Sequence, residues 1–168
     1  MRKMIIGLVI LGSMGVTTSL FAAPGFQIIT LMRAAAGGKC TASTAKLALG
    51  GFIIHDELSR FICGVDSVQV PTNKISTASV YVIVPNTTYG KPYMKLCFRS
   101  MVNNSHYCGP LAYGTASSSM QKITAAAPSG TFDDSYVAFI ELYINKTDTY
   151  NYFYGIELSQ LIFVPFLK

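Results

Sequence analysis

The stretch YMKLCFRSMVNNSHYCGPLAY, residues 93–113, decides how this chain folds. Apolar and polar residues alternate over 93–100 and again over 105–113, which is the pattern of two half-buried β-strands. The residues between them, Met-Val-Asn-Asn at 101–104, have the length and composition of a hairpin turn. The sequence therefore predicts an antiparallel hairpin.

The register of this hairpin places Cys97 directly opposite Cys108. The face that we expect to be buried then consists of apolar, aromatic and small residues: Met94, Leu96, Phe98, Tyr107, Gly109 and Leu111. Two cysteines directly across a strand pair lie within reach of a disulfide bond. Cys97–Cys108 is therefore the preferred disulfide, and Cys40–Cys63 is then the second one. The other two ways of connecting four cysteines stay open.

The remainder of the chain repeats the strand pattern between turns rich in Gly, Pro, Asn and Ser. The further expected strands are 52–55, 60–65, 68–70, 78–84, 120–124, 136–144 and 152–164, the last with a bend near Gly155. Within 136–144, one face carries the residues Tyr136, Ala138, Ile140, Leu142 and Ile144. Residues 44–49 suit a helical turn that ends at Gly50-Gly51. Seven to eight such strands predict an all-β fold, a jelly-roll-like antiparallel β-sandwich with two disulfides.

The N-terminus has the pattern of an export signal. Met1-Arg2-Lys3 is positively charged, residues 4–21 are apolar or small, and Ala22-Ala23 follow as a small-residue site. Because Pro24 is a poor first mature residue, we expect cleavage after Ala22; an uncleaved membrane anchor is the alternative. We thus expect a signal peptide at 1–22, an N-terminal segment at 23–50 tied to the sheet by a disulfide, and a sandwich at 51–168. The mature chain, with no later membrane span, would be periplasmic or secreted.

Charge and cysteine spacing exclude two common classes of binding protein. The formal net charge is +5, and two of the cations, Arg2 and Lys3, lie in the expected signal. No basic cluster is present that would follow a phosphate backbone, so we expect no nucleic-acid partner. The four cysteines form no C-x-x-C pair, and His55 and His106 are not at zinc-ligand spacing from them.

Candidate catalytic and metal-binding residues are few. There is no G-x-S-x-G motif, and we expect neither enzymatic activity nor a cofactor. Glu141 and Glu157 would form a glycosidase-like carboxylate pair only if the last two long strands were neighbours. Asp133 and Asp134, with Asp148 as a distant partner, offer oxygen ligands for calcium, although a turn is the simpler interpretation.

The most suggestive group of residues is aromatic. Tyr150, Tyr152 and Tyr154 alternate along TDTYNYFYG, residues 147–155, and share one face if this segment is a strand. Such a row presents flat apolar rings with hydroxyl groups at their edges, which suits a sugar ring or a protein surface. Packing at one end of the core is the alternative role.

Several segments carry a resemblance to known proteins. Lys39-Cys40, Gly50-Gly51-Phe52-Ile53, Phe61-Ile62-Cys63-Gly64-Val65, Val80-Tyr81-Val82 and Lys95-Leu96-Cys97-Phe98 resemble, in this order, a group of small exported bacterial proteins of unassigned role. These proteins share one cysteine that closes a strand and another in a later strand. The resemblance covers roughly residues 39–168 and implies a fold and an export route, but no activity.

The last 50 residues also resemble the end of jelly-roll carbohydrate-binding modules. The matching segments are Met120-Gln121-Lys122-Ile123, Phe139-Ile140-Glu141-Leu142 and Ile156-Glu157-Leu158-Ser159. The chain departs from those modules in having no Trp, the residue that often stacks on sugars there. We therefore expect an exported, non-catalytic protein that binds a glycan, or alternatively a structural or protein-interaction subunit of a surface or secreted assembly.

Overall fold

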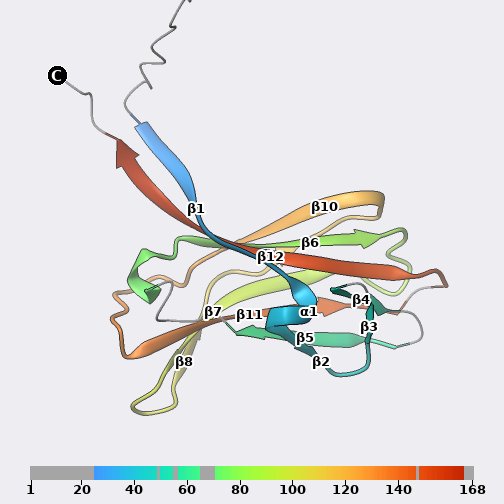
Figure 1. Ribbon diagram of the computed structural model, residues 1–168, viewed down its shortest axis with the longest axis horizontal. Coiled ribbons are helices and arrows are strands. Elements are labelled where there is room, and N and C mark those ends of the chain that lie inside the picture. Colours follow the sequence, from blue (N-terminus) through green and yellow to red (C-terminus); the bar gives the residue numbers. More distant parts are fainter. Residues whose placement is uncertain (1–24, 49, 55–56, 65–70, 147, 165–168) are drawn as a thin grey trace, which may run out of the picture.

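The computed structural model describes residues 25–48, 50–54, 57–64, 71–146 and 148–164, which form two antiparallel sheets packed face to face (Figure 1). The expected all-β antiparallel sandwich is confirmed. Its elements are β1 (Gly25–Ala35), α1 (Ala36–Lys39), β2 (Cys40–Ala42), β3 (Lys46–Ala48), β4 (Gly51–Ile54), β5 (Ser59–Gly64), the 3-10 turn η1 (Thr72–Lys74), β6 (Thr77–Val84), β7 (Tyr93–Ser100), β8 (His106–Cys108), β9 (Ala112–Tyr113), β10 (Ser117–Ala126), β11 (Tyr136–Ile144) and β12 (Asn151–Val164).

The two sheets draw their strands from distant parts of the chain. Sheet A has the order β10-β6-β12-β4-β3, with β1 also paired to β12. Sheet B has the order β2-β5-β11-β7-β8, with β9 also paired to β7. The last two long strands, β11 and β12, therefore lie in different sheets although only a short loop connects them.

The core fills the space between the sheets because alternate residues of each strand point inward. In β11 the residues Ala138, Ile140, Leu142 and Ile144 are buried, as the period-two pattern predicts. Phe61 of sheet B packs edge-on against Phe52 and Phe153 of sheet A, with ring centroids 5.1 and 5.0 Å apart. Burial of each such ring contributes about 2–3 kcal/mol, so these rings hold the two layers together.

The predicted hairpin is present, with Cys97 opposite Cys108 and Arg99 opposite His106. Beyond Cys108 the expected register is wrong by one residue, because Met94 pairs with Ala112 and Leu111 is exposed instead. The expected strand 105–113 is split into β8 and β9 at Gly109-Pro110. Proline has no N–H to donate, so the ladder cannot continue through it.

Two other expectations change or fall outside the described residues. The helical turn expected at 44–49 is wrong, since Lys46–Ala48 form β3 and pair with β4; tertiary pairing overrides the local preference. The expected strand at 68–70 and the signal peptide at 1–22 lie outside the described residues. The short strands β2, β3, β8 and β9 bring the number of described strands above the seven or eight expected.

Both disulfides are present and join directly opposed residues of neighbouring strands. Cys40–Cys63 connects β2 to β5 on the core side of sheet B. Cys97–Cys108 connects β7 to β8 on the outer side, the side that Lys95 and Arg99 share. Each bond therefore fastens a short edge strand to a longer strand of the same sheet.

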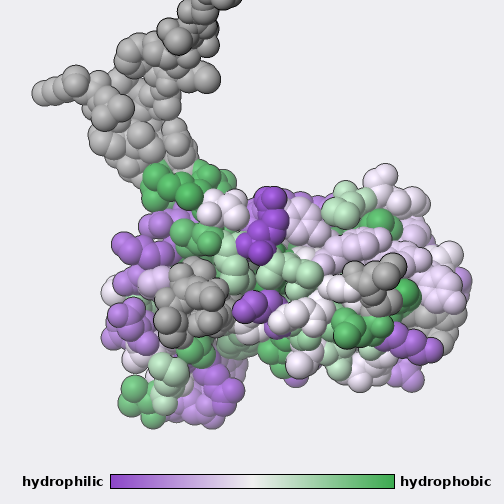
Figure 2. Space-filling model, viewed as in Figure 1, coloured by the Kyte–Doolittle hydropathy of each residue, from purple (hydrophilic) through white to green (hydrophobic). Residues whose placement is uncertain are grey.

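Strands β1 and the end of β12 form a two-stranded ribbon that extends beyond the sandwich (Figure 1). We call residues 25–30 and 159–164 the arm. The predicted bend at Gly155 is confirmed by a register shift between Phe153 and Gly155. A Cβ at Gly155 would lie 2.8 Å from the carbonyl oxygen of Ala34, so only glycine permits β1 to approach here. Figure 2 shows hydrophobic residues where the arm leaves the sandwich.

No helix in the described part of the chain is long and apolar enough to cross a membrane.

Candidate functional site

A groove of about 570 Å³ lies on the outer face of sheet B, which we call face B. Strand β11 runs along its floor and contributes Val137, Phe139 and Glu141, the residues that alternate with the buried ones. Strand β5 contributes Arg60, Ile62 and Gly64 to one wall, and Arg99, Asn104 and His106 come from the β7–β8 hairpin. A volume of this size is typical of ligand pockets.

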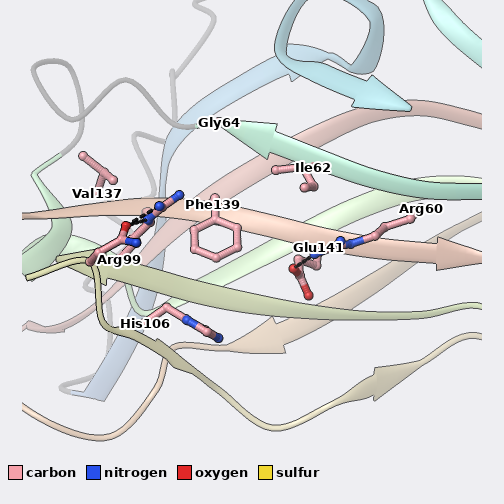
Figure 3. Close-up of a pocket in the computed structure, with 10 residues that line it drawn as sticks. Arg60, Ile62, Gly64, Arg99, His106, Val137, Phe139 and Glu141 are labelled. Carbon is pink, nitrogen blue, oxygen red and sulfur yellow. Dashed lines mark hydrogen bonds and ion pairs between the residues drawn. The ribbon is translucent and has the colours of Figure 1, made fainter. Parts of the chain in front are cut away.

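The aromatic ring of Phe139 lies in the middle of the groove, with Arg99 toward one end and Glu141 and Arg60 toward the other (Figure 3). Phe139 is directly opposite Gly64 on one side and Cys97 on the other. A Cβ at Gly64 would have no atom within 4 Å, so the missing side chain leaves open space beside the ring. The ring is thus accessible because its β5 neighbour has no side chain.

Glu141 is held by a cation on each side. Its Oε1 accepts a hydrogen bond from Arg60, and its Oε2 forms an ion pair of 2.8 Å with Lys95. Burial alone would raise the pKa of Glu141, but the hydrogen bonds from Lys95 and Arg60 outweigh it and hold the pKa below its ordinary value. The carboxylate therefore stays ionised and fixed, with 8% of its side chain exposed.

Arg99 has a different kind of partner. Its Nε donates a hydrogen bond of 2.6 Å to the amide oxygen of Asn104, and its Nη2 donates to the same oxygen. Asn104 has a φ of 62° in the hairpin turn, a conformation that asparagine adopts more readily than most residues. The turn therefore orients the guanidinium with a neutral acceptor, and no ion pair between described residues includes Arg99.

Further tyrosines continue face B beyond the groove. Tyr93 and Tyr143 stack with ring centroids 4.8 Å apart, and Tyr113 lies 5.9 Å from Tyr93. The guanidinium of Arg60 lies 5.8 Å from the Tyr143 ring. Burial raises the pKa of Tyr93, with the nearby Tyr143 and Tyr113 adding to the effect. The Tyr143 ring therefore flanks Arg60 at one end of the groove.

Two of the three tyrosines selected from the sequence, Tyr152 and Tyr154, lie on the other outer face, face A. Tyr152 and Tyr154 stack with centroids 6.0 Å apart, while Asn151 before them and Phe153 between them are buried, as the alternation predicts. Tyr154 also lines a shallower cavity of about 300 Å³ together with Arg33, Tyr81 and Met120. Tyr150 precedes β12 and is exposed.

A charged cluster joins four strands beside these tyrosines. Glu157 of β12 accepts hydrogen bonds from Arg33 of β1, from the hydroxyl of Tyr81 of β6 at 2.7 Å and from Lys122 of β10 at 2.5 Å. Burial alone would raise the pKa of Glu157, but the hydrogen bonds from Lys122, Tyr81 and Arg33 outweigh it and lower the pKa to about 2. Only 3% of the Glu157 side chain is exposed, so its partners enclose the carboxylate while Arg33 and Lys122 remain partly exposed.

The hypothesis of a Glu141–Glu157 carboxylate pair is wrong. The strands that carry them lie in different sheets. Both side chains point outward, because Ile140, Leu142, Ile156 and Leu158 beside them are in the core. The two carboxylates therefore lie on opposite faces of the sandwich and cannot flank one bond of a substrate.

The loop before β11 uses Asp133 to form a turn. Its Oδ1 accepts hydrogen bonds from the backbone N–H of Ser135 at 2.9 Å and from its hydroxyl at 2.5 Å. The hydroxyl of Tyr89 donates a 3.2 Å hydrogen bond to Asp148. The described residues contain no group of three or more His, Cys, Asp or Glu that could hold a metal ion. The structure thus gives Asp133 the turn role, and nothing in it adds support to the calcium hypothesis for Asp133 and Asp134.

Sequence reasoning missed the groove, although part of its signal is in the sequence. Alternation in 136–144 already places Phe139 and Glu141 on the face away from the core. The strands that flank β11 could not be predicted, because they pair with it from segments 35 or more positions away. These pairings are what bring Gly64 and Arg99 near Phe139.

No family model and no curated protein matches this sequence. Solved structures are similar in fold. One is the family 22 carbohydrate-binding module and catalytic module of Clostridium thermocellum xylanase 10B in complex with xylohexaose, with 9% identity, a TM-score of 0.48 and coverage of 83% of this chain and 30% of that longer one. Another is a family 11 carbohydrate-binding module from Clostridium thermocellum with a mixed-linked tetrasaccharide, with 15% identity, a TM-score of 0.42 and coverage of 82% and 96%.

A third is a mannan-recognising carbohydrate-binding module of family 27, with 6% identity, a TM-score of 0.42 and coverage of 80% of this chain and 98% of that one. With identities this low and TM-scores below 0.5, these similarities assign no ligand to this chain.

Proposed function

We propose that this chain is an exported, non-catalytic protein that binds a glycan in the groove on face B. The observation that carries the proposal is the groove itself, a long open depression with one accessible aromatic ring between fixed polar side chains. A sugar presents an apolar C–H face and hydroxyl groups around its edge. An aromatic floor with Arg and Asn side chains at its margins complements both parts.

The polar side chains are already oriented before any ligand binds. Arg60 and Lys95 hold Glu141, and Asn104 holds Arg99. Groups fixed in this way lose little conformational freedom when they contact a ligand, which favours affinity. The groove, with β11 along its floor, suits a chain molecule that lies along this strand.

The test is a glycan-array screen of the oxidised chain, with a variant that fills the groove. Gly64→Val places a branched side chain in the open space beside Phe139 and has the β-propensity of a strand residue. Gly38→Val is the matched control, since a Cβ there also has no atom within 4 Å and Gly38 does not line the groove. We expect binding by the parent and the control but not by the folded Gly64→Val variant. Binding that Gly64→Val retains would contradict the groove as the site.

The tyrosines on face A are a second proposed contact surface for the same class of ligand. The stacked Tyr152 and Tyr154, with the exposed Tyr150, present the flat rings expected from the sequence. A triple change of Tyr150, Tyr152 and Tyr154 to Ala distinguishes the two faces on the same array. Loss of binding in this variant, with Gly64→Val unaffected, would move the site to face A.

The arm supports an alternative role as an interaction subunit. Beyond Ser159, β12 pairs with β1 alone among the described strands, although the Leu161 N–H donates to the Ser76 hydroxyl; Ile28 is 69% exposed. Open strand edges with apolar side chains can pair with another strand, here the same arm of a second copy. Sedimentation velocity over a range of concentrations tests this role, with Ile28→Lys as the disrupting variant. A monomer at all concentrations would exclude it.

Export is proposed from the N-terminal pattern together with the two disulfides, which persist in oxidising compartments. N-terminal sequencing of the protein from a periplasmic or culture-medium fraction should begin at Ala23. An intact N-terminus on a membrane-bound chain would contradict cleavage.

A further inference from the structure

We infer that the groove on face B selects glycans that carry anionic groups, so that an acidic sugar binds where its neutral counterpart does not. This inference rests on the proposed glycan-binding function and concerns its ligand class. It comes from the charges that the fold gathers at the groove: Arg60, Arg99 and the adjacent Lys95 against the single described carboxylate of Glu141.

The carboxylate of Glu141 does not repel an anion, because its own charge is already compensated. Arg60 and Lys95 each contact one of its oxygens. Two cations on one carboxylate leave a net positive charge at that end of the groove. The side chain is also nearly buried, so a ligand meets the cations rather than the acid.

Arg99 supplies the second positive charge, at the other end of the Phe139 ring (Figure 3). No ion pair between described residues includes it, and its one side-chain partner, Asn104, is neutral. The Nε and Nη2 groups donate to Asn104, and no hydrogen bond between described residues uses Nη1, so we take that side of the guanidinium as the one that meets a ligand. A planar guanidinium forms paired hydrogen bonds with a carboxylate or sulfate, and these are stronger than hydrogen bonds to hydroxyl groups.

The spacing of these charges favours a sugar over other anions. The accessible ring lies between the two positive ends, so a ligand needs an apolar face as well as an anionic substituent. A polyphosphate backbone binds to a continuous row of basic side chains, whereas the cations of this groove are separated from one another. An acidic peptide has the charge without the flat face.

The test compares glycans that differ only in charge: oligogalacturonate with its methyl ester, and a sulfated galactan oligosaccharide with its desulfated form. Poly-glutamate of similar length is the peptide probe. The variants are Arg99→Gln, which removes the charge, Arg99→Lys, which keeps it, and Lys46→Gln, an exposed lysine outside the groove whose loss changes the net charge equally.

We expect an acidic glycan to bind the parent, with affinity that falls as salt is raised, and its neutral form to bind weakly. Arg99→Gln should lower that affinity about tenfold, the cost of one hydrogen bond to a charged group, while Lys46→Gln should not. Arg99→Lys should restore part of it.

Three results would overturn the inference, each in a different way. Equal or tighter binding of the neutral forms would reject anionic selectivity and leave glycan binding in place. Binding of no glycan at millimolar concentration would reject the proposed function itself. Binding of poly-glutamate as tightly as the acidic glycans would assign the groove to acidic peptides.

Discussion

The two outer faces of this sandwich each bury a glutamate beneath two cations, but the groove on face B is larger than the cavity on face A. On face A, Glu157 is contacted by Arg33, Lys122 and the hydroxyl of Tyr81, and these groups span four strands. On face B, Glu141 is contacted by Arg60 and Lys95 across three strands, and the space beside it toward Arg99 is open.

The difference shows how one arrangement of charges can serve two purposes. In face A the cluster closes on itself and ties β1 and β10, two edge strands, to the centre of the sheet. In face B the cluster forms one end of a groove, and an arginine with a neutral partner stands at the other. A buried carboxylate with satisfied hydrogen bonds is thus compatible with a structural clamp or with the margin of a binding site; the size of the neighbouring space distinguishes the two.

Removal of the Cys97–Cys108 bond should have the largest effect and should act on face B alone. Changing both cysteines to Ala releases β8, which carries His106 on the groove wall. It also removes the closure of a loop of about 12 residues in the unfolded chain, which should lower the free energy of unfolding by about 3 kcal/mol. Urea unfolding and ligand binding measure both consequences. An unchanged groove affinity in the folded variant would show that β8 does not shape the site.

Replacing each glutamate with Gln should separate the clamp from the groove. We expect Glu157→Gln to lower the free energy of unfolding by about 2 kcal/mol, because two cations and a buried hydroxyl lose their carboxylate. The value of about 2 kcal/mol already allows for solvent screening, because Arg33 and Lys122 are exposed. Glu141→Gln should lower the free energy of unfolding by about 1 kcal/mol, because Glu141 has fewer partners than Glu157. Chemical denaturation at neutral pH gives both values, and equal losses would remove the distinction between the faces.

Acid should weaken the clamp on face A before the rest of the core is lost. The pKa of Glu157 is lowered from 4.5 to about 2, so its stabilising effect is complete above 4.5 and declines as the pH falls toward 2. Between pH 6 and pH 3 the parent should lose about 1 kcal/mol more than Glu157→Gln, after allowance for solvent screening. Urea midpoints at a series of pH values test this. Parallel curves for the two proteins would contradict it.

Much of the architecture could be predicted from local pattern. The limits of β7 and β11 are those the alternation predicts, and the disulfide pairs follow from the hairpin register. The slip after Gly109-Pro110 and the strand at Lys46–Ala48 were not foreseen, because each depends on a partner strand rather than on the segment itself.

The candidate site was harder to predict for a related reason. A groove is a property of space between side chains, and here that space exists because Gly64 happens to lie beside Phe139. A glycine in a strand carries no signal of what it adjoins. Tyr152 and Tyr154 are conspicuous in the sequence, yet the larger depression is on the opposite face.

The pairing of Gly25 with Val164 has a mechanical consequence. Both ends of the arm leave the molecule at the same point, so a force that separates these residues acts along the hydrogen bonds between β1 and β12 and breaks them one pair at a time. The peeled segment ends at Cys40, which is covalently bound to Cys63 of β5. Under tension, peeling from the N-terminal side would therefore reach Cys40 and there meet a covalent bond to sheet B.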